Sequence, residues 1–347
     1  MASPVSPRIV VAGAGSIGCY VGGRLALAGR DVTLLLRPRL AAELREHGLR
    51  LTDYEGRDER IPPDRLALAT EPAALAGAEI VLVTVKSGAT AEMAALIAAH
   101  APPAAVVVSL QNGIGNAETL RAALPGQRVH AGMVPFNVVQ LGGGRFHRGT
   151  EGALAVEAAS DLAPLLAVEG LPAEAEADMP ALLWGKLLLN LNNALNALSG
   201  LPLARQLADR GWRRLLAAQM AEALDLLAAA GIRPRKVAKV PPRLLPHILR
   251  LPDPLFRRIA GAMLRIDPDA RSSMWEDLSR GRPTEIDHLQ GAVLALAERL
   301  GRDAPTARRV VALVRAAEAE GRVPGLAPAA VLAGGPTASR SGPSRAA

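Results

Sequence analysis

The first half of the chain alternates short apolar runs with helical patterns. Residues 9–11 and 32–36 form two β-rich runs with a helix-forming stretch between them. Residues 79–85 and 106–110 form two more, separated by a helical pattern at 89–100. Strands that alternate with helices are typical of a parallel, doubly wound sheet. The pattern therefore predicts an α/β fold for this half.

Two segments depart from the alternation. After a helical pattern at 38–47, residues 49–68 resemble a hairpin. Residues 130–140 and 145–156 flank a second turn, LGGG at 141–144. Two extended runs joined by a short glycine-rich turn indicate an antiparallel pair. We expect this pair to extend the parallel sheet on one side.

Beyond Met179 only helical patterns remain, and such a change marks a domain boundary near 178–181. We expect a doubly wound sheet domain at 8–179 and an all-helical domain at 180–325. The segment 326–347 ends in a Gly/Ser/Pro-rich stretch, and we expect it to be a disordered tail. The expected helices of the second half are 181–198, 203–230, 244–264, 271–279, 285–300 and 306–320.

The loop after the first apolar run reads GAGSIG at 13–18, a G-x-G-x-x-G pattern. A strand before it and a helix after it turn this weak pattern into a predicted dinucleotide site. Gly13 permits the tight turn, Gly15 lets the backbone reach a pyrophosphate, and Gly18 lets helix and strand pack closely. Backbone N–H groups at the start of the helix then face the phosphates. The alternative is a glycine-rich turn of an ordinary βαβ unit.

The end of the second strand indicates which dinucleotide binds. An acidic residue about 20 positions beyond the glycines holds the ribose 2′-OH of NAD, whereas an Arg accommodates the 2′-phosphate of NADP. Asp31 comes too early, because it opens the strand. Arg37 follows the strand, and its guanidinium matches a phosphate with two charge-assisted hydrogen bonds. A solvated strand-end Arg is the alternative, and we favour NADP(H) over NAD.

Composition narrows the class of protein. The chain has 347 residues, 50% hydrophobic and 2% aromatic, with a net charge of +7. Its basic residues are dispersed and lack interleaved aromatics, so we expect no nucleic-acid partner. The positive electrostatic field of these residues would equally attract an anionic cofactor and an acidic substrate.

The single cysteine, Cys19, excludes a disulfide framework and a multi-cysteine metal site, and it fits a reducing cytoplasm. We interpret it as a small packing residue. Residues 1–7 are too short and polar for a secretory signal, and Lys186 interrupts the longest apolar stretch. We expect a cytoplasmic protein with no membrane partner and no metal.

Ligands of doubly wound sheets lie outside the carboxyl ends of the strands. Two of these ends carry polar residues, Lys86 and Asn112. A Lys or an Asn-Gly pair at a strand end is often only part of a turn. Two of them at one edge favour contact with a ribose or a nicotinamide.

The stretch from Trp184 on, WGKLLLNLNN, carries the strongest candidates for chemistry. Helical spacing places Lys186, Asn190, Asn193 and Ala197 on one face. Polar side chains in a Leu-rich helix need partners or water, so this face is either solvated or a site. A protonated Lys can donate a proton to the oxyanion that hydride attack creates. None of the six histidines has metal-ligand spacing or a suitably placed acid, which favours Lys as the donor.

A third stretch reads SSMWED and then RPTEID. Ser273 and Asp277 share a helical face. Thr284 resembles an N-cap with Asp287 three residues on, which places Glu285 in the first turn of a new helix. Glu285 could simply complement the helix dipole. Alternatively, Ser and Glu could bind hydroxyl or carboxylate groups of a small substrate.

These stretches together resemble ketopantoate reductases, and the resemblance extends from Arg8 to about Arg322. It rests on GAGSIG at 13–18, TVK ending at Lys86, QNGIG, WGKLLLN and SSMWED…RPTEID, together with Arg37. It implies a Rossmann domain followed by a helical domain, with the active site in the cleft between them. It also implies hydride transfer from NADPH to the keto carbon of 2-dehydropantoate, which gives pantoate for pantothenate synthesis.

The resemblance also implies roles for single residues. The residue matching Lys186 is the proton donor, and Glu285 holds the cofactor ribose near the reacting centre, so both are expected to be catalytic. The expected substrate-binding residues are Asn112, Lys186, Asn190, Asn193 and Ser273. The expected cofactor-binding residues are Gly13, Ala14, Gly15, Ser16, Ile17, Gly18, Arg37, Lys86, Asn112, Val138 and Glu285.

The chain departs from the family pattern at two positions. The second substrate Asn of the family corresponds to Ala194, and Asn193, one residue earlier, is its expected substitute. A further family Asn falls near Leu203. These departures leave open a reductase of another branched 2-keto acid.

Two alternative functions and the oligomeric state stay open. A dehydrogenase for 3-hydroxy acids is disfavoured by Arg37 and by the Ser273/Glu285 segment. A non-catalytic NADPH sensor would not need Lys186. The long apolar helices could support a homodimer.

Overall fold

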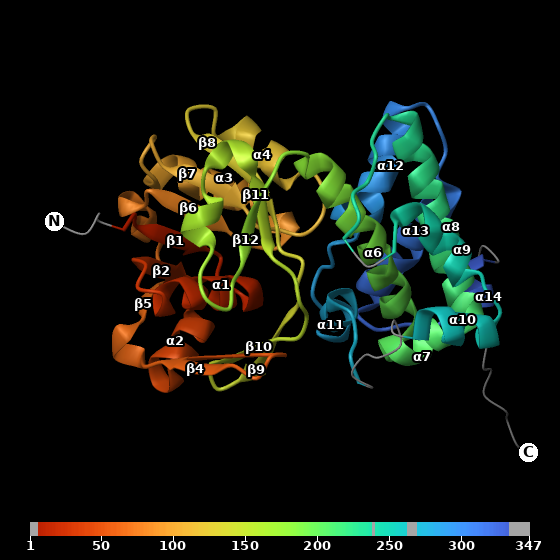
Figure 1. The fold of residues 1–347 in the computed structure, drawn as a ribbon, viewed down its shortest axis with the longest axis horizontal. Coiled ribbons are helices and arrows are strands. Elements are labelled where there is room, and N and C mark those ends of the chain that lie inside the picture. Colours follow the sequence, from red (N-terminus) through yellow and green to blue (C-terminus); the bar gives the residue numbers. More distant parts are fainter. Residues whose placement is uncertain (1–5, 238–239, 262–268, 333–347) are drawn as a thin grey trace, which may run out of the picture. The chain divides into compact units, whose positions relative to one another are not determined.

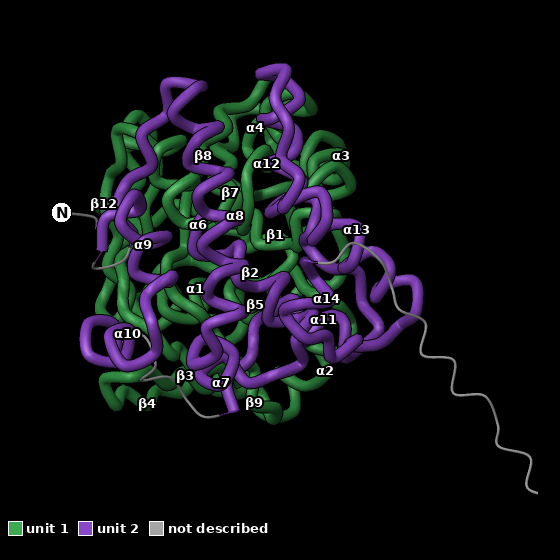
Figure 2. The backbone as a smooth tube through the Cα atoms, turned by 90° about the vertical axis from the view of Figure 1, so that its right-hand side faces the viewer, with its two compact units in different colours: residues 1–187 green, residues 188–347 purple. Residues whose placement is uncertain are grey.

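The computed structural model describes residues 6–237, 240–261 and 269–332. The chain divides into two compact units, residues 1–187 and 188–347, which Figure 2 draws in green and purple. The dividing point lies inside a single helix, α6 (Met179–Ser199). We describe each unit by itself.

The first unit is built on an eight-stranded sheet with the order β12-β11-β8-β7-β6-β1-β2-β5 (Figure 1). All neighbours pair in parallel except β11 and β8, which are antiparallel. The strands are β1 (Ile9–Ala12), β2 (Val32–Leu35), β5 (Ala67–Ala69), β6 (Ile80–Val83), β7 (Val106–Ser109), β8 (Arg128–Met133), β11 (Leu154–Glu157) and β12 (Ala173–Glu176).

The central strands are apolar throughout because both faces of the sheet are covered. Successive side chains point to opposite faces, so Val11 and Leu82 enter one core whereas Val10 and Val81 enter the other. Helix α1 packs into the first core, and α3 and α4 pack into the second (Figure 1). The helices of this unit before α6 are α1 (Ser16–Leu27), α2 (Pro38–His47), α3 (Thr90–His100), α4 (Asn116–Ala123) and α5 (Ala163–Leu166). The predicted doubly wound sheet is confirmed.

The predicted antiparallel extension is only partly correct. The strands that flank the LGGG turn do not join the main sheet. They pair as a hairpin in a second, four-stranded sheet of order β4-β3-β10-β9, and β10 also pairs in parallel with β3. The antiparallel member of the main sheet is β11 instead. The strands of the second sheet are β3 (Leu49–Asp53), β4 (Asp58–Ile61), β9 (Val138–Gly142) and β10 (Arg145–Arg148).

The second sheet packs on the face of α1 that points away from the main sheet. A Cβ atom at Gly23 of α1 would collide with Leu49 and Leu51 of β3. Close approach of helix and sheet therefore requires glycine at that position. Phe146 of β10 is fully buried in the same core. A local hairpin signal cannot show which sheet the hairpin joins, because this contact comes from residues far apart in the chain.

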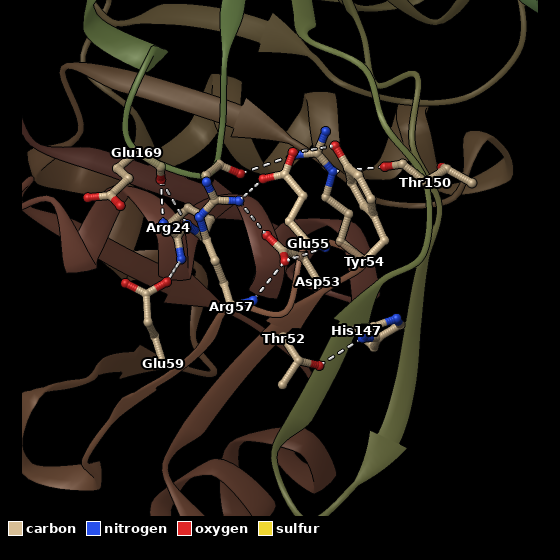
Figure 3. Close-up of polar contacts among 12 residues, drawn as sticks. Arg24, Thr52, Asp53, Tyr54, Glu55, Arg57, Glu59, His147, Thr150 and Glu169 are labelled. Carbon is tan, nitrogen blue, oxygen red and sulfur yellow. Dashed lines mark hydrogen bonds and ion pairs between the residues drawn. The ribbon is translucent and has the colours of Figure 1, made fainter.

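Charged side chains form hydrogen bonds and ion pairs between this sheet and neighbouring segments (Figure 3). Arg24 of α1, 2% exposed, pairs with Glu59 of β4 and donates to the carbonyl oxygen of Glu169. Arg148 of β10 stacks on the ring of Phe136 at 4.2 Å and donates to backbone carbonyl oxygens. Buried guanidinium groups with acceptors of this kind connect segments that no backbone ladder joins.

The second unit contains helices only, within the residues that the structure describes, as predicted. Its helices after α6 are α7 (Leu203–Ala208), α8 (Arg210–Ala229), α9 (Leu245–Leu249), α10 (Asp253–Ala260), α11 (Ser273–Ser279), α12 (Gln290–Arg299), α13 (Pro305–Glu320) and α14 (Pro328–Leu332). Short 3-10 turns in the chain are Pro63–Arg65, Pro72–Gly77, Ser87–Ala89, Ala158–Ser160, Pro242–Leu244 and Ile286–His288. Among the described helices, none is long and apolar enough to cross a membrane.

Several predicted helices are broken. The helix expected over 203–230 breaks at Asp209, whose side chain accepts hydrogen bonds from the N–H groups of Gly211 and Trp212 and so caps α8. The helix expected over 244–264 breaks before Pro252, and its last residues lie outside the described ones. The helix expected from 285 begins five residues later.

The disordered tail was predicted to begin at residue 326, and this predicted starting point is too early. Residues 328–332 form α14, and Val331 is 2% exposed. The N–H of Leu326 donates to the carbonyl oxygen of Leu198 in α6 at 2.8 Å. Residues 333–347 lie outside the described ones.

Candidate active site

The glycine loop forms a turn that other residues cannot adopt. Gly13 has φ of +78°, and a Cβ atom there would collide with Val85. The N–H groups of Gly13 and Ala14 donate to the carbonyl oxygen of Leu35 at 3.0 and 2.9 Å. A Cβ atom at Gly18 would collide with Thr84 and Val11. The turn is thus fixed against two neighbouring strands.

Gly15 differs from the other two glycines because nothing lies within 4 Å of its missing Cβ. The residue precedes α1, and no acidic side chain occupies the first turn of that helix. An open space at a helix N-terminus with free access to the backbone fits an anionic pyrophosphate. The residues present therefore fit a dinucleotide, and binding itself stays a prediction.

Cys19 lies one turn inside α1 and is fully buried. Burial, with a smaller contribution from Glu43, raises the pKa of its thiol. A protonated, inaccessible thiol is no nucleophile. The interpretation of Cys19 as a packing residue agrees with this environment.

Arg37 lies at the carboxyl end of β2, exposed, as the N-cap residue of α2. Asp31 lies at the other end of that strand, where it pairs with Arg8 at 3.5 Å. Only the arginine is thus at the edge of the sheet where the glycine turn lies.

Lys186 of α6 belongs to the same compact unit as the glycine turn. Its Nζ donates to Oδ1 of Asn112 at 2.7 Å and to the carbonyl oxygen of Val134. Asn112 follows β7, and β6 separates β7 from β1 in the sheet. The ammonium group therefore lies at the carboxyl edge of the parallel strands, where doubly wound folds bind ligands.

Two further expected cofactor residues of this unit are Lys86 and Val138. Lys86 is exposed and precedes a 3-10 turn at the end of β6. Val138 begins β9 of the second sheet, half-buried against the core that contains α1.

The polar face predicted for α6 is present but shorter than expected. After Pro180, every residue of the helix that is not fully buried lies on one stripe, which is made of Leu183, Lys186, Leu189, Asn190 and Asn193. Ala197 was predicted to continue this face, and it is fully buried instead. Ala194 is also fully buried. Asn193, rather than position 194, is therefore on the stripe with Lys186.

Ser273 and Asp277 of α11 do not share an environment. Ser273 is exposed, whereas Asp277 is 2% exposed and pairs with Arg282 at 3.1 Å. The buried serine is Ser272, which caps α11 and donates to the carbonyl oxygen of Asn193 at 3.0 Å. The prediction of a shared face is wrong with respect to exposure, because Asp277 is buried and Ser273 is not.

The interpretation of Thr284 as the N-cap of an α-helix is also wrong. Its Oγ1 accepts from the N–H of Ile286 at 3.2 Å and closes a local turn. Glu285 then precedes a 3-10 turn, half-buried, and not the first turn of α12. Ser273 and Glu285 both belong to the second unit.

The sequence did not predict the buried polar network that hydrogen-bonds to the backbone of Asn112. Its members are at most 5% exposed: Ser87, Thr90, Ser109, Gln111 and Asn116. Gln111 and Asn116 stand near Asn112 in the chain, but nothing in the local pattern shows that they are buried. The signal that could have found them is the cluster of small polar residues after two neighbouring apolar strands.

Comparison with known proteins assigns the family. The family model "Ketopantoate reductase PanE/ApbA" matches residues 9–161, and its C-terminal counterpart matches 178–318. A 2-dehydropantoate 2-reductase of Mesorhizobium japonicum is 31% identical, over 89% of this chain and 97% of the relative. One of Halobacterium salinarum is 30% identical, over 90% and 100%.

Solved structures agree. A PanE/ApbA family ketopantoate reductase from Ralstonia eutropha superposes with a TM-score of 0.76 at 34% identity, covering 90% of this chain and 99% of that one. A 2-dehydropantoate 2-reductase from Geobacter metallireducens gives 0.75 at 25% identity, covering 89% and 99%. The sheet unit with its glycine turn, the helical second unit and these matches lead to one conclusion: the chain belongs to the ketopantoate reductase PanE/ApbA family of oxidoreductases.

Proposed function

We propose that the protein is an NADPH-dependent 2-dehydropantoate 2-reductase, which converts the keto group of its substrate to the hydroxyl group of pantoate. The observation that carries the proposal is the contact of Lys186 Nζ with Asn112 at 2.7 Å, at the sheet edge that holds the glycine turn. The names of the relatives at 30–31% identity support the choice of substrate.

The residues of the sheet unit hold the cofactor, which supplies the hydride when bound. The N–H groups of the first turn of α1, at Ser16, Ile17 and Gly18, bind the pyrophosphate beside the open space at Gly15. Arg37 binds the 2′-phosphate, for which an exposed guanidinium at a strand end is suited. Lys86, Asn112 and Val138 complete the contacts on this unit, and Glu285 holds the ribose.

Lys186 donates the proton to the carbonyl oxygen as hydride reaches the keto carbon. Two oxygen acceptors, on Asn112 and Val134, hold its ammonium group in place. A proton donor fixed in this way acts without reorganisation in the transition state. Asn190 and Asn193, on the same stripe of α6, bind the substrate together with Ser273.

A second candidate is the reduction of another 2-keto acid by the same chemistry. Position 194, where the family has its substrate Asn, is a fully buried Ala, and Leu203 begins α7 with a side chain that makes no polar contact. Both changes alter substrate contacts and leave the lysine intact. A non-catalytic sensor is disfavoured by the placement of Lys186. A homodimer and a cytoplasmic location remain predictions.

The test is turnover of purified protein with NADPH and a panel of 2-keto acids, followed at the nicotinamide absorbance. We expect 2-dehydropantoate to give the highest kcat/KM. Lys186→Ala should lower kcat by about 10²- to 10⁴-fold with little effect on NADPH binding, because a positioned acid is lost. Lys236→Ala, at an exposed lysine, is the control and should not change kcat.

The outcomes separate the candidates. A higher kcat/KM with another 2-keto acid supports the second candidate. NADPH binding without turnover of any acid supports the sensor. Unchanged kcat in Lys186→Ala contradicts the role of the lysine.

A further inference from the structure

The backbone of Asn112 is held by side chains that no step of the proposed reaction uses. Its carbonyl oxygen accepts hydrogen bonds from Ser87 Oγ at 2.8 Å and from Asn116 Nδ2 at 2.6 Å. Asn116 Nδ2 also lies 3.1 Å from Ser87 Oγ. The end of β6 and the start of α4 therefore meet at one atom of the residue that contacts Lys186.

Thr90, the first residue of α3, is the centre of this network. Its hydroxyl oxygen accepts from Gln111 Nε2 at 2.7 Å. The same oxygen lies 2.7 Å from the carbonyl oxygen of Ser87 and 2.8 Å from Asn116 Oδ1, and its one proton serves one of these two acceptors. Gln111 in turn donates to the carbonyl oxygen of Val85 at 3.1 Å. The loops after β6 and β7 are thus cross-linked by buried hydrogen bonds.

The loop that carries Asn112 needs such support. Gly113 and Gly115 have φ of +85° and +94°, in the left-handed region. Glycine restricts the backbone less than any other residue, so a loop with two of them has little stiffness of its own. Hydrogen bonds among buried groups are strong and directional, because water does not compete for them.

We propose that Asn116 and Thr90 are positioning residues for catalysis: Asn116 donates to the carbonyl oxygen of Asn112, Thr90 contacts the side chain of Asn116, and Asn112 Oδ1 in turn fixes the ammonium group of Lys186. The inference rests on the proposed function of Lys186 as proton donor. It assigns a reaction-related role to two buried residues that contact neither substrate nor cofactor. Their effect is on geometry, and a misplacement of about 1 Å at a reacting group can cost about 100-fold in rate.

The first test is Asn116→Ala, with kcat referred to the number of NADPH-binding sites. We expect kcat to fall about 10- to 100-fold, with the KM of the keto acid and the Kd of NADPH changed by less than about two-fold. The control is Gln127→Ala. The side-chain amide of Gln127 also donates a hydrogen bond to a backbone carbonyl oxygen, that of Pro102, at 3.0 Å. This contact lies before the amino ends of β7 and β8, at the edge of the sheet opposite Asn112. This variant should leave kcat unchanged.

The second test separates shape from hydrogen bonding. Thr90→Val keeps the volume and removes the hydroxyl, whereas Thr90→Ser keeps the hydroxyl. We expect Thr90→Val to lower kcat in the same way as Asn116→Ala, and Thr90→Ser to restore most of it. If the two residues contribute to stability alone, Asn116→Ala and Thr90→Val will lower the fraction of protein that binds NADPH and leave kcat per NADPH-binding site unchanged. That result would overturn the inference.

Failure of the inference and failure of the proposed function give different results. If Lys186→Ala retains full kcat, the proposed function fails, and the inference fails with it. If Lys186→Ala is impaired while Asn116→Ala and Thr90→Val are not, only the inference is overturned. If both act through the lysine, Asn116→Ala should cause no further loss in the Lys186→Ala background.

Discussion

At the scale of single residues, partners decide the role of each charged group. Lys186 is held by acceptors at the carboxyl edge of the sheet, whereas Arg24 and Arg213 are buried among acceptors in the interiors of their units. Arg213 also stacks on Phe256 at 4.1 Å and pairs with Asp253. These two buried arginines therefore serve the structure of their units. Arg37, by contrast, is exposed at a strand end, where we propose that it binds the 2′-phosphate of NADPH.

Arg37→Ala should weaken binding of NADPH at least about ten-fold and leave NADH nearly unaffected, since only the former carries the 2′-phosphate. Fluorescence titration with both nucleotides measures this. Arg45→Ala, an exposed arginine in the last turn of the same helix, should weaken neither nucleotide. Equal weakening of NADPH and NADH by Arg37→Ala would disprove the assignment.

At the scale of elements, the second sheet shows how a hairpin is held by its side chains. Asp53 at the end of β3 accepts from the N–H groups of Glu55 and Arg57 and from the Arg57 guanidinium. Burial by itself raises the pKa of Asp53, but these hydrogen bonds, mainly from Arg57, outweigh it and leave the pKa below its ordinary value of 3.8. The turn between β3 and β4 thus depends on an ionised carboxylate.

This carboxylate makes stability depend on pH. A lowered folded-state pKa means that the stabilising contribution of Asp53 is complete above the unfolded value of 3.8 and is lost as pH falls through the folded value. We expect Asp53→Asn to lower the free energy of unfolding by about 1–3 kcal/mol at pH 7, with a smaller deficit at pH 3. Urea denaturation at both pH values measures the difference.

The matched control is Asp58→Asn. Asp58 forms an exposed ion pair with Arg50 in the same sheet, and such pairs contribute little. It should change stability little at either pH. A deficit of Asp53→Asn that stays constant from pH 7 to pH 3 would contradict the role of the charge.

At the scale of the whole molecule, the folded part of the chain extends further than composition indicates. α14 contributes Val331, which is buried, and Leu332, which is 68% exposed. Arg309 of α13 donates to the carbonyl oxygens of Val331 and Ala330 at 3.3 and 3.4 Å. The last described helix is therefore part of the second unit.

Val331→Asp should destabilise the second unit by more than about 2 kcal/mol, because it places a charge in an apolar site. Leu332→Asp, one residue away but exposed, should have almost no effect. Thermal unfolding of both variants measures the contrast. Equal melting temperatures for Val331→Asp and the parent protein would show that α14 does not stabilise the fold.

Much of the first unit could be predicted because its signals are local. The apolar runs became β1, β2, β6 and β7, and the helix expected at 38–47 has those bounds. Gly13 and Gly18 stand where no Cβ atom fits, as the turn pattern required. Helix ends were predicted less well, because Asp209 and Pro252 interrupt long apolar patterns whose periodicity hardly changes.

The sequence by itself determined the parallel sheet, the glycine turn and the succession of sheet and helices, because these follow from periodicity and from the spacing of neighbours in the chain. Only the tertiary structure decided that the LGGG hairpin joins a second sheet and that Asp277 turns inward. It alone showed that Ser87, Thr90 and Asn116 support Asn112. The pairing of the hairpin with β3 and the contacts of Ser87 and Thr90 join segments tens of residues apart, and a local pattern does not encode which distant segments meet.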